Sequence, residues 1–142
     1  MSLEFREEKL NVQDYLNLRA KVGWKELSNR QAEKALENAL YMVCVYDDVN
    51  GALVGMGRLI GDEGVISYIQ DLIVLPTYRR QGIGGKIVKM LREKAESLCA
   101  PDEEMMLCLM SAKGRESFYR NCGFTERPTE HLGPGMIMYL HK

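Results

Sequence analysis

The sequence predicts a mixed α+β domain, with a largely antiparallel β-sheet flanked by helices. Two observations carry this prediction. Strand-like runs at residues 41–46, 52–60 and 65–75 follow one another with short turns between them, which is typical of an antiparallel meander. Residues 68–91 then pass from a strand through a glycine-rich turn into a helix, and a further apolar run follows at 105–110. A helix between two strands favours a β-α-β crossover, so we expect these two strands to be parallel.

The segments before the meander predict one strand and two helices. Leu3–Arg6 alternates apolar and polar residues, as a half-buried strand does. Asn11 can cap a first helix, whose apolar residues recur at helical spacing, and Gly23 suits its C-terminal end. Ser28 and Gln31 have the spacing of a capping box, so a second helix is expected to begin there.

The turns and the C-terminal segments complete an expected order of β-α-α-β-β-β-α-β-α-β. The Asn50-Gly51 pair is the strongest hairpin signal of the meander. Met105–Met110 is a continuous apolar run and predicts a strand that is buried on both faces. Arg115–Asn121 predicts a short helix, and Met136–Leu140 predicts a last strand after the Gly133-Pro134-Gly135 turn.

Size and composition narrow the classes of function. The 142 residues fit a single domain, residues 1–142, and 46% hydrophobic with 27% charged residues is an ordinary globular mixture. A formal net charge of −1 gives no support to a nucleic-acid-binding protein, which is usually basic. No apolar run approaches the roughly 20 residues of a membrane span, and residues 1–9 do not resemble a signal peptide. We therefore expect a cytoplasmic protein with no membrane partner.

The cysteines and histidines do not form a metal-binding pattern. No two of the four cysteines have CxxC spacing, and the two histidines lie far from them in the sequence. We therefore expect no metal, and cysteines that are buried or idle thiols. These residues are Cys44, Cys99, Cys108 and Cys122, with His131 and His141.

The glycine-rich turn at residues 79–85 predicts an anion-binding site. It follows a strand and opens a helix, so free backbone N–H groups and the positive end of the helix dipole converge there. Two known phosphate-binding motifs do not match. A P-loop needs glycine where Arg80 stands and serine or threonine where Ile87 stands, and the dinucleotide fingerprint also needs glycine at Ile87. Neither a nucleoside triphosphatase nor a nicotinamide-dependent enzyme is favoured.

The turn instead contains Arg79-x-x-Gly82-x-Gly84, which resembles the GCN5-related N-acetyltransferases, the GNAT superfamily. The strand before it, in IQDLIVLPTYRRQGIG, looks like the corresponding strand of that family. Residues 117–124, SFYRNCGF, resemble its late FY-x-x-x-GF motif. The order of elements also agrees, so the resemblance covers nearly the whole chain. It implies a GNAT-like fold and a protein that binds acetyl-coenzyme A.

The resemblance implies positions for the parts of the coenzyme. The diphosphate would accept hydrogen bonds from the N–H groups of residues 81–85, with Lys86 adding charge nearby. The pantetheine arm would pair with backbone at residues 72–74, and the Val74 N–H would stabilise the oxyanion of the thioester. The expected coenzyme-binding residues are Leu72, Ile73, Val74, Arg79, Arg80, Gln81, Gly82, Ile83, Gly84, Gly85, Lys86 and Tyr119. For Arg79 and Arg80, contact with phosphate and plain surface charge both remain open.

The resemblance also implies catalytic roles. Tyr119 matches a tyrosine that can protonate the leaving thiolate, and a phenol is in its acid form near neutral pH. Relatives often carry an acidic residue or histidine where Tyr68 or Gln70 stands, so Asp71 is the one carboxylate near the expected site. Asp71 could act as general base through water or have a structural role. Side chains alternate along a strand, so Tyr68 and Gln70 share a face and Asp71 takes the other, unless a bulge intervenes.

The function expected from these residues is transfer of the acetyl group of acetyl-coenzyme A to a primary amine. The amine would attack directly in a ternary complex. The alternative is a coenzyme A or acyl-coenzyme A sensor that performs no transfer. The acceptor is unidentified and expected to be small, with Trp24, Tyr68, Gln70 and Asp71 as candidate contacts. The last strand is a candidate surface for a homodimer.

Overall fold

The computed structural model describes residues 2–142. By the contacts of its backbone, the chain divides into two compact units, Met1–Met110 and Ser111–Lys142, and each is described by itself. None of the helices in residues 2–142 is both long and apolar enough to cross a lipid bilayer.

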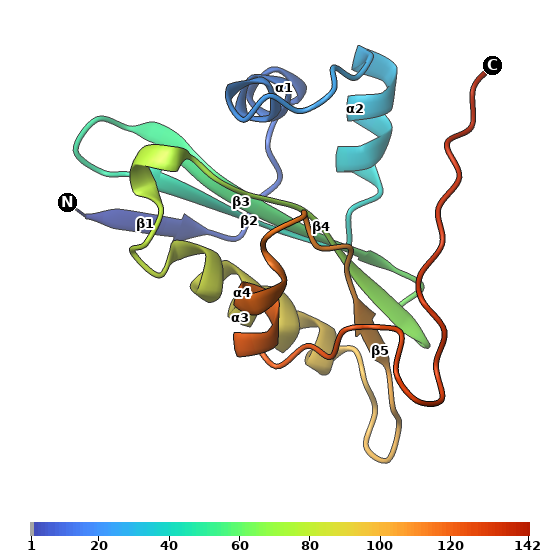
Figure 1. Ribbon diagram of the computed structural model, residues 1–142. Helices are drawn as coiled ribbons and strands as arrows, with labels where there is room; N and C mark the ends of the chain where they lie inside the picture. Colours follow the sequence, from blue (N-terminus) through green and yellow to red (C-terminus); the bar gives the residue numbers. More distant parts are fainter. Residues whose placement is uncertain (1) are drawn as a thin grey trace. The chain divides into compact units, whose positions relative to one another are not determined.

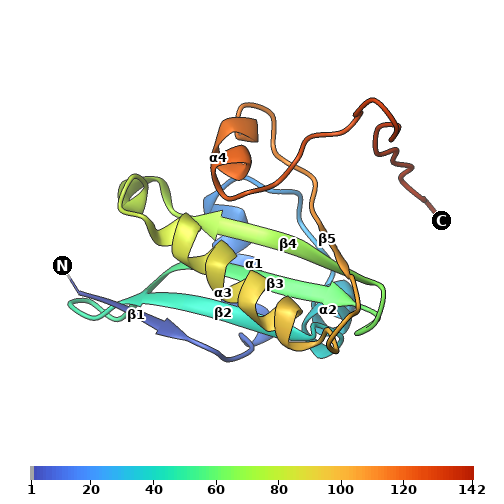
Figure 2. The same ribbon diagram turned by 90° about the horizontal axis from the view of Figure 1, so that it is seen from below.

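The first unit is a five-stranded sheet with helices on both faces (Figure 1). Strands β1 to β4 pair antiparallel in chain order, and β5 pairs parallel with β4. Helices α1 and α2 cover one face, and α3 crosses β2, β3 and β4 on the other (Figure 2). The elements are β1 (Leu3–Arg6), α1 (Val12–Lys21), α2 (Asn29–Glu37), β2 (Tyr41–Asp47), β3 (Ala52–Gly61), β4 (Ile66–Val74), η1 (Pro76–Tyr78), α3 (Ile83–Ser97) and β5 (Met106–Cys108). The mixed α+β fold predicted from the sequence is confirmed.

The first two helices begin at the caps that the sequence predicts. The Asn11 side chain accepts a hydrogen bond from the Asp14 N–H at 2.8 Å. In α2, Ser28 accepts from the Gln31 N–H at 3.1 Å, and the Gln31 side chain accepts from the Ser28 N–H at 3.0 Å. These bonds satisfy N–H groups that have no partner within the helix, so each helix has a defined start.

Glycine allows α3 to lie very close to β3. A Cβ atom built on Gly57 would stand 2.6 Å from Ile87 Cγ2 and 3.0 Å from Leu91 Cδ1. Both side chains are fully buried and lie in the middle of α3. Only a residue without a side chain therefore fits at this crossing. The close packing fixes the position of α3, and so of the glycine turn from which it begins.

A bulge interrupts β4 at Asp71. Met56 faces Ile73 across the sheet, while Arg58 faces Gln70, so two steps along β3 span three along β4. Asp71 has a left-handed backbone with φ of 56°. The extra residue changes the alternation, and the Asp71 carboxylate contacts α1. The Asp71 side chain therefore lies on the same face of the sheet as Gln70 and Arg58. A bulge produces this arrangement, whereas in a regular strand Asp71 would lie on the face opposite to Gln70.

The prediction of a strand buried on both faces at Met105–Met110 is wrong. Only Met106–Cys108 is a strand, and the Met106 side chain is 49% exposed. The strand pairs with β4 at three positions, opposite Ile66, Ser67 and Tyr68, and has no second neighbour among the described residues. An apolar run is buried on both faces only where other elements cover both, and β5 is an edge strand.

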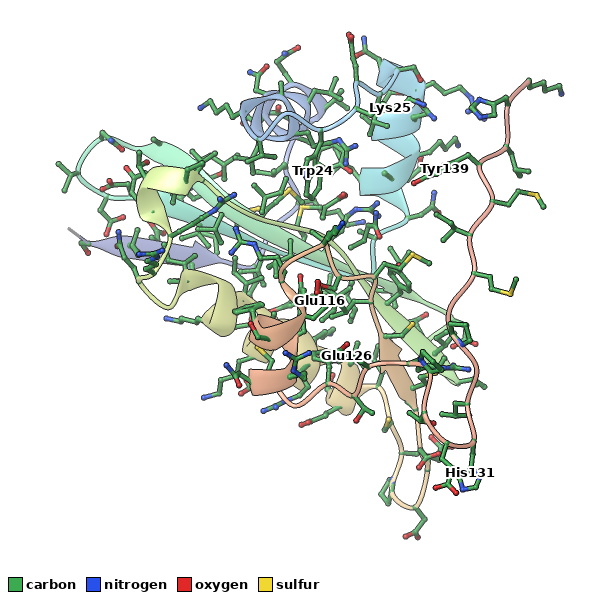
Figure 3. All side chains as sticks on the ribbon, viewed as in Figure 1. Trp24, Lys25, Glu116, Glu126, His131 and Tyr139 are labelled. Atoms are coloured by element: carbon green, nitrogen blue, oxygen red, sulfur yellow. The ribbon has the colours of Figure 1, made fainter. Side chains whose placement is uncertain are left out.

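The second unit contains one helix, α4 (Glu116–Asn121), within the predicted range of Arg115–Asn121. Arg120 forms an ion pair with Glu126, which is labelled in Figure 3. The last strand predicted at Met136–Leu140 does not form, and the exposure of these side chains ranges from 63% to 90%. Apolar and β-prone residues form a strand only when another strand pairs with them, and in residues 2–142 none pairs with this segment.

Candidate active site

The C-terminal half of β4 presents a free edge. β5 pairs with β4 only as far as Tyr68, so within residues 2–142 no strand pairs with that edge from Ile69 to Val74. On the other side β3 remains paired as far as Val74. An unpaired edge offers backbone N–H and C=O groups to an extended ligand. This edge includes residues 72–74, where the resemblance to the GNAT family implies that the pantetheine arm would pair.

The glycine turn follows the end of this strand, where hydrogen bonds anchor it and its backbone is exposed to solvent. Leu75 N–H donates to Val54 O at 2.9 Å, and the Tyr78 hydroxyl donates to Asp47 Oδ2 at 2.6 Å, so the turn is tied to β3 and to the end of β2. Gly82 is the N-cap of α3 with φ of 79°, a conformation that favours glycine. A Cβ atom on Gly82 or Gly85 would meet no atom within 4 Å. The backbone of the turn is thus accessible.

The start of α3 has the features of an anion site. Gly82 provides no side-chain cap, and the first turn carries no acidic residue. The first N–H of the helix with a backbone acceptor is that of Lys86, which donates to Gly82 O at 3.1 Å. The N–H groups before it have no hydrogen-bond acceptor among the described residues. These donors and the helix dipole together can bind the oxygens of a phosphate group.

Two of the three basic side chains at the turn, those of Arg79 and Lys86, already have partners. Arg79 Nε donates to Val74 O at 3.2 Å, so this side chain folds back toward the end of β4. Lys86 Nζ lies 4.1 Å from the centre of the Phe5 ring, beside β1. Arg80 is exposed and has a left-handed φ of 64°. Backbone groups, more than these side chains, make the anion site.

Asp71 lies at the centre of a buried charged cluster. Its side chain is 1% exposed. Oδ1 accepts from Arg19 Nη1 at 2.9 Å, and Oδ2 accepts from Arg58 Nε at 2.7 Å and from the Tyr15 hydroxyl. Burial, and then the hydrogen bond to Asp71, raise the pKa of Tyr15, which therefore remains a neutral phenol. These contacts support the structural role for Asp71, because guanidinium groups already engage both of its oxygens.

The residues expected on the acceptor side lie near this cluster. Gln70 is opposite Arg58 in the sheet, and Tyr68 is opposite Ile60 two residues further along the same face. The Arg19 guanidinium carbon lies 5.2 Å from the centre of the Trp24 ring, which is 39% exposed. Trp24 stands on the connection between α1 and α2 (Figure 3). The first unit thus brings Trp24, Gln70 and Asp71 together around two arginines.

Tyr119 belongs to the second unit. Its ring packs edge-to-face with Phe118, with centres 5.0 Å apart, and with Phe124, at 6.1 Å. Burial raises the pKa of Tyr119, so the phenol keeps its proton at neutral pH. Its hydroxyl has no hydrogen-bond partner among residues 2–142. A protonated phenol with a free O–H group can donate a proton to a ligand.

The sequence reasoning missed the three partners of Asp71. Arg58 interrupts an otherwise apolar strand, and Arg19 occupies a position with the helical spacing of the buried face of α1. A charge at an expected core position predicts a buried ion pair, so each signal was present in the sequence. What the sequence did not show was that both arginines meet one carboxylate, because only the bulge turns Asp71 toward them.

The comparisons with known proteins agree with this geometry. A family model described as an acetyltransferase (GNAT) domain matches residues 37–126, which include the glycine turn and the FY-x-x-x-GF motif. The chain belongs to the GNAT acetyltransferase family. Members of this family are acyltransferases that use acetyl-coenzyme A as cosubstrate together with an acceptor.

Relatives cover most of this GNAT chain. A GNAT-family acetyltransferase of Streptococcus pneumoniae is 30% identical, covers 99% of this chain and 100% of its own, and superimposes with a TM-score of 0.81. An uncharacterised N-acetyltransferase, ycf52-like, of Prochlorococcus marinus is 32% identical over 75% of this chain. A chloroplastic GCN5-related N-acetyltransferase of Arabidopsis thaliana is 33% identical over 63% of it. The chain spans 58% and 35% of the lengths of these last two relatives.

Proposed function

We propose that this protein transfers the acetyl group of acetyl-coenzyme A to a primary amine of a small acceptor, by direct attack in a ternary complex. The observation that carries the proposal is the combination of an unpaired β4 edge with unoccupied N–H donors at the start of α3. The first suits an extended pantetheine arm and the second suits a diphosphate. The family supplies the acetyl donor.

In this proposal the backbone holds the coenzyme. The N–H groups of residues 81–85 bind the diphosphate, and Val74 N–H stabilises the negative charge that develops on the thioester oxygen. Arg79 lies back along β4 and keeps the turn next to that strand. Lys86 and Arg80 contribute positive charge near the phosphates. Bonds from main-chain groups tolerate many side chains, which is why this part of the site has little sequence signature beyond its glycines.

We propose Tyr119 as the general acid that protonates the leaving thiolate. The raised pKa of its phenol, caused by burial, supports this role, because the group must carry a proton at neutral pH. The amine nitrogen attacks the thioester carbonyl, the C–S bond breaks, and the thiolate receives a proton. The proton lost by the amine passes to water. Asp71 is assigned a positioning role, because both of its oxygens accept bonds from buried partners.

The first test is binding and turnover in sequence. Calorimetric titration with acetyl-coenzyme A should show one site per chain. No heat of binding at millimolar ligand would sink the proposal. A thiol-release assay over chemically different amines should then identify at least one acceptor.

A Tyr119→Phe variant tests the acid. It should lower kcat by roughly 100-fold, the lower range for one general acid, with little change in coenzyme affinity. Tyr139→Phe is the matched control, because Tyr139 is 78% exposed. An unchanged kcat in Tyr119→Phe would remove Tyr119 from the mechanism.

A coenzyme A sensor is the second candidate. The engagement of Asp71 by two arginines and a tyrosine favours it, since no other carboxylate stands on the Gln70 face of β4. Coenzyme binding without release of thiol on any acceptor would support the sensor over the transferase.

A further inference from the structure

The charged cluster on the α1 and α2 face has more positive than negative charge. Two guanidinium groups, of Arg19 and Arg58, share one carboxylate, that of Asp71, which leaves an excess of one positive charge. Among the described residues, neither arginine has a second acidic partner. Tyr15 remains neutral, because burial raises its pKa. An excess charge in a mostly buried place is costly unless an anion neutralises it.

Part of this excess charge remains available to a ligand. The side chains of Arg19 and Arg58 are 13% and 11% exposed, so each is mostly buried but still reaches the surface. Arg58 uses Nε for Asp71 and Nη1 for a long bond of 3.4 Å to Ala35 O. Its Nη2 makes no hydrogen bond within residues 2–142 and is not among the buried unpaired atoms. An unused N–H pair of a fixed guanidinium suits a carboxylate or phosphate oxygen.

The neighbours that the sheet and α1 place beside the cluster, Gln70, Tyr68 and Trp24, are not acidic. Gln70 faces Arg58 across the sheet, and Tyr68 follows on the same face. The Gln70 amide does not ionise, and burial raises the pKa of the Tyr68 phenol, so both side chains are neutral. Trp24 stacks on Arg19 and leaves part of its ring exposed. A polyamine would meet an excess of positive charge here, whereas an anionic group would meet its complement.

We infer that the acceptor is an amine that also carries an anionic group, a carboxylate or a phosphate, and that Arg58 binds this group with Arg19 beside it. The inference rests on the proposed acetyl transfer, and it adds the chemical class of the acceptor. Asp71 then positions both guanidinium groups and does not itself contact the acceptor. Asp71 neutralises one of the two positive charges, so one positive charge remains for the acceptor. The site should therefore select acceptors that carry an anionic group.

Matched pairs of acceptors test the class. The thiol-release assay is run with O-phosphoethanolamine against ethanolamine, and with β-alanine against β-alaninamide, together with spermidine and phenethylamine. The anionic member of at least one pair should have a kcat/KM at least about tenfold higher than its neutral partner, the effect of one hydrogen bond to a charged group. Equal or better turnover of the neutral members, or of spermidine or phenethylamine, would overturn the inference.

A second measurement does not depend on turnover. The Nε–Hε signal of Arg58 is followed by NMR in the coenzyme A-bound protein while O-phosphoethanolamine or ethanolamine is added. Only O-phosphoethanolamine should shift the signal. No shift with either compound overturns the inference even if calorimetry shows acetyl-coenzyme A bound, and the proposed function then stands without it. A shift without turnover supports the anion site and contradicts acetyl transfer.

The variant Arg58→Lys separates charge from geometry. Lysine keeps the positive charge beside Asp71 but loses the planar fork. The preference for the anionic member over the neutral member of each pair should fall by about tenfold. Arg92→Gln is the control, since Arg92 lies on the exposed side of α3 and pairs with Glu96. A preference that survives in Arg58→Lys unchanged contradicts the role of Arg58.

Discussion

The two faces of the sheet position their helices by different means. On one face α3 packs against β3 through glycine and aliphatic side chains, with Gly57, Ile87 and Leu91 in close contact. On the other face α1 is joined to β3 and β4 by an apolar core and also by three ionised side chains, Arg19, Arg58 and Asp71. Apolar packing alone positions the helix on the first face, whereas apolar packing and ion pairs together position α1 on the second.

This difference matches the proposed work of each face. The α3 face fixes where the glycine turn stands, and in the proposed function the coenzyme is bound by backbone groups that need only a fixed position. The α1 face is the one proposed to recognise the acceptor, and recognition needs polar side chains held in defined directions. A bulge with left-handed backbone turns Asp71 inward and provides those directions. Buried charges stabilise a fold little, so their presence here is better explained by specificity.

The largest effect is expected from breaking the charged face. Asp71→Asn keeps a residue that tolerates the left-handed backbone and removes only the negative charge. Two nearly buried guanidinium groups lose their partner, so the free energy of unfolding should fall by roughly 3–5 kcal/mol. Urea denaturation measures this loss. Glu93→Gln, which breaks an exposed pair with Lys89, should leave stability nearly unchanged. Equal losses in both variants would show that burial does not matter.

The face of the sheet covered by α3 should be destabilised by added side-chain volume, because its packing depends on shape and not on charge. Gly57→Val places a branched side chain where Ile87 Cγ2 would already lie 2.6 Å from a Cβ atom. We expect a loss of about 1–3 kcal/mol in the free energy of unfolding, from overpacking. The control is Gly64→Ala, because a Cβ atom there meets only Asp62 Oδ1, at 3.7 Å. A stable Gly57→Val protein would mean that α3 can move away from the sheet, and acetyl-coenzyme A affinity should then fall.

A smaller effect is expected at the glycine turn. Gly82→Ala forces alanine into a backbone with φ of 79°, which costs roughly 1–2 kcal/mol. The added methyl group also occupies the open side of the turn, so the Kd for acetyl-coenzyme A should rise several-fold. Gly51→Ala has a similar φ of 70° in the β2–β3 turn and provides the control. It should lose similar stability and keep its coenzyme affinity. Calorimetry distinguishes the two outcomes.

The smallest effect at neutral pH concerns the Tyr15 hydroxyl. Its folded-state pKa is raised, by burial first, so its contribution to stability is complete below the unfolded pKa of about 10 and is lost as pH rises through the folded value. Stability should therefore fall above about pH 10. In Tyr15→Phe the free energy of unfolding should fall less steeply with pH in this alkaline range, by up to roughly 1.4 kcal/mol per pH unit. An unchanged alkaline slope in thermal unfolding would show that Tyr15 ionises equally in both states.

Most of the fold could be predicted because local patterns determine it. The caps at Asn11 and Ser28 depend on residues within one turn of helix, and both are confirmed. The predictions at Met105–Met110 and Met136–Leu140 failed for a shared reason. Each assumed that an apolar run finds covering elements, and the described residues do not supply them. Burial is a property of neighbours, and a single segment does not contain that information.

The sequence by itself determined the proposed coenzyme side of this protein, and the tertiary structure decided the proposed acceptor side. Gly82 and the turn around it form a local strand-to-helix junction, whose donors follow from the geometry of a helix start. The cluster of Arg19, Arg58 and Asp71 joins residues separated by as many as 52 positions, and one bulged residue brings them together. Features that depend on adjacent residues can be predicted from the sequence, whereas ion pairs between residues far apart in the sequence form only when the chain folds.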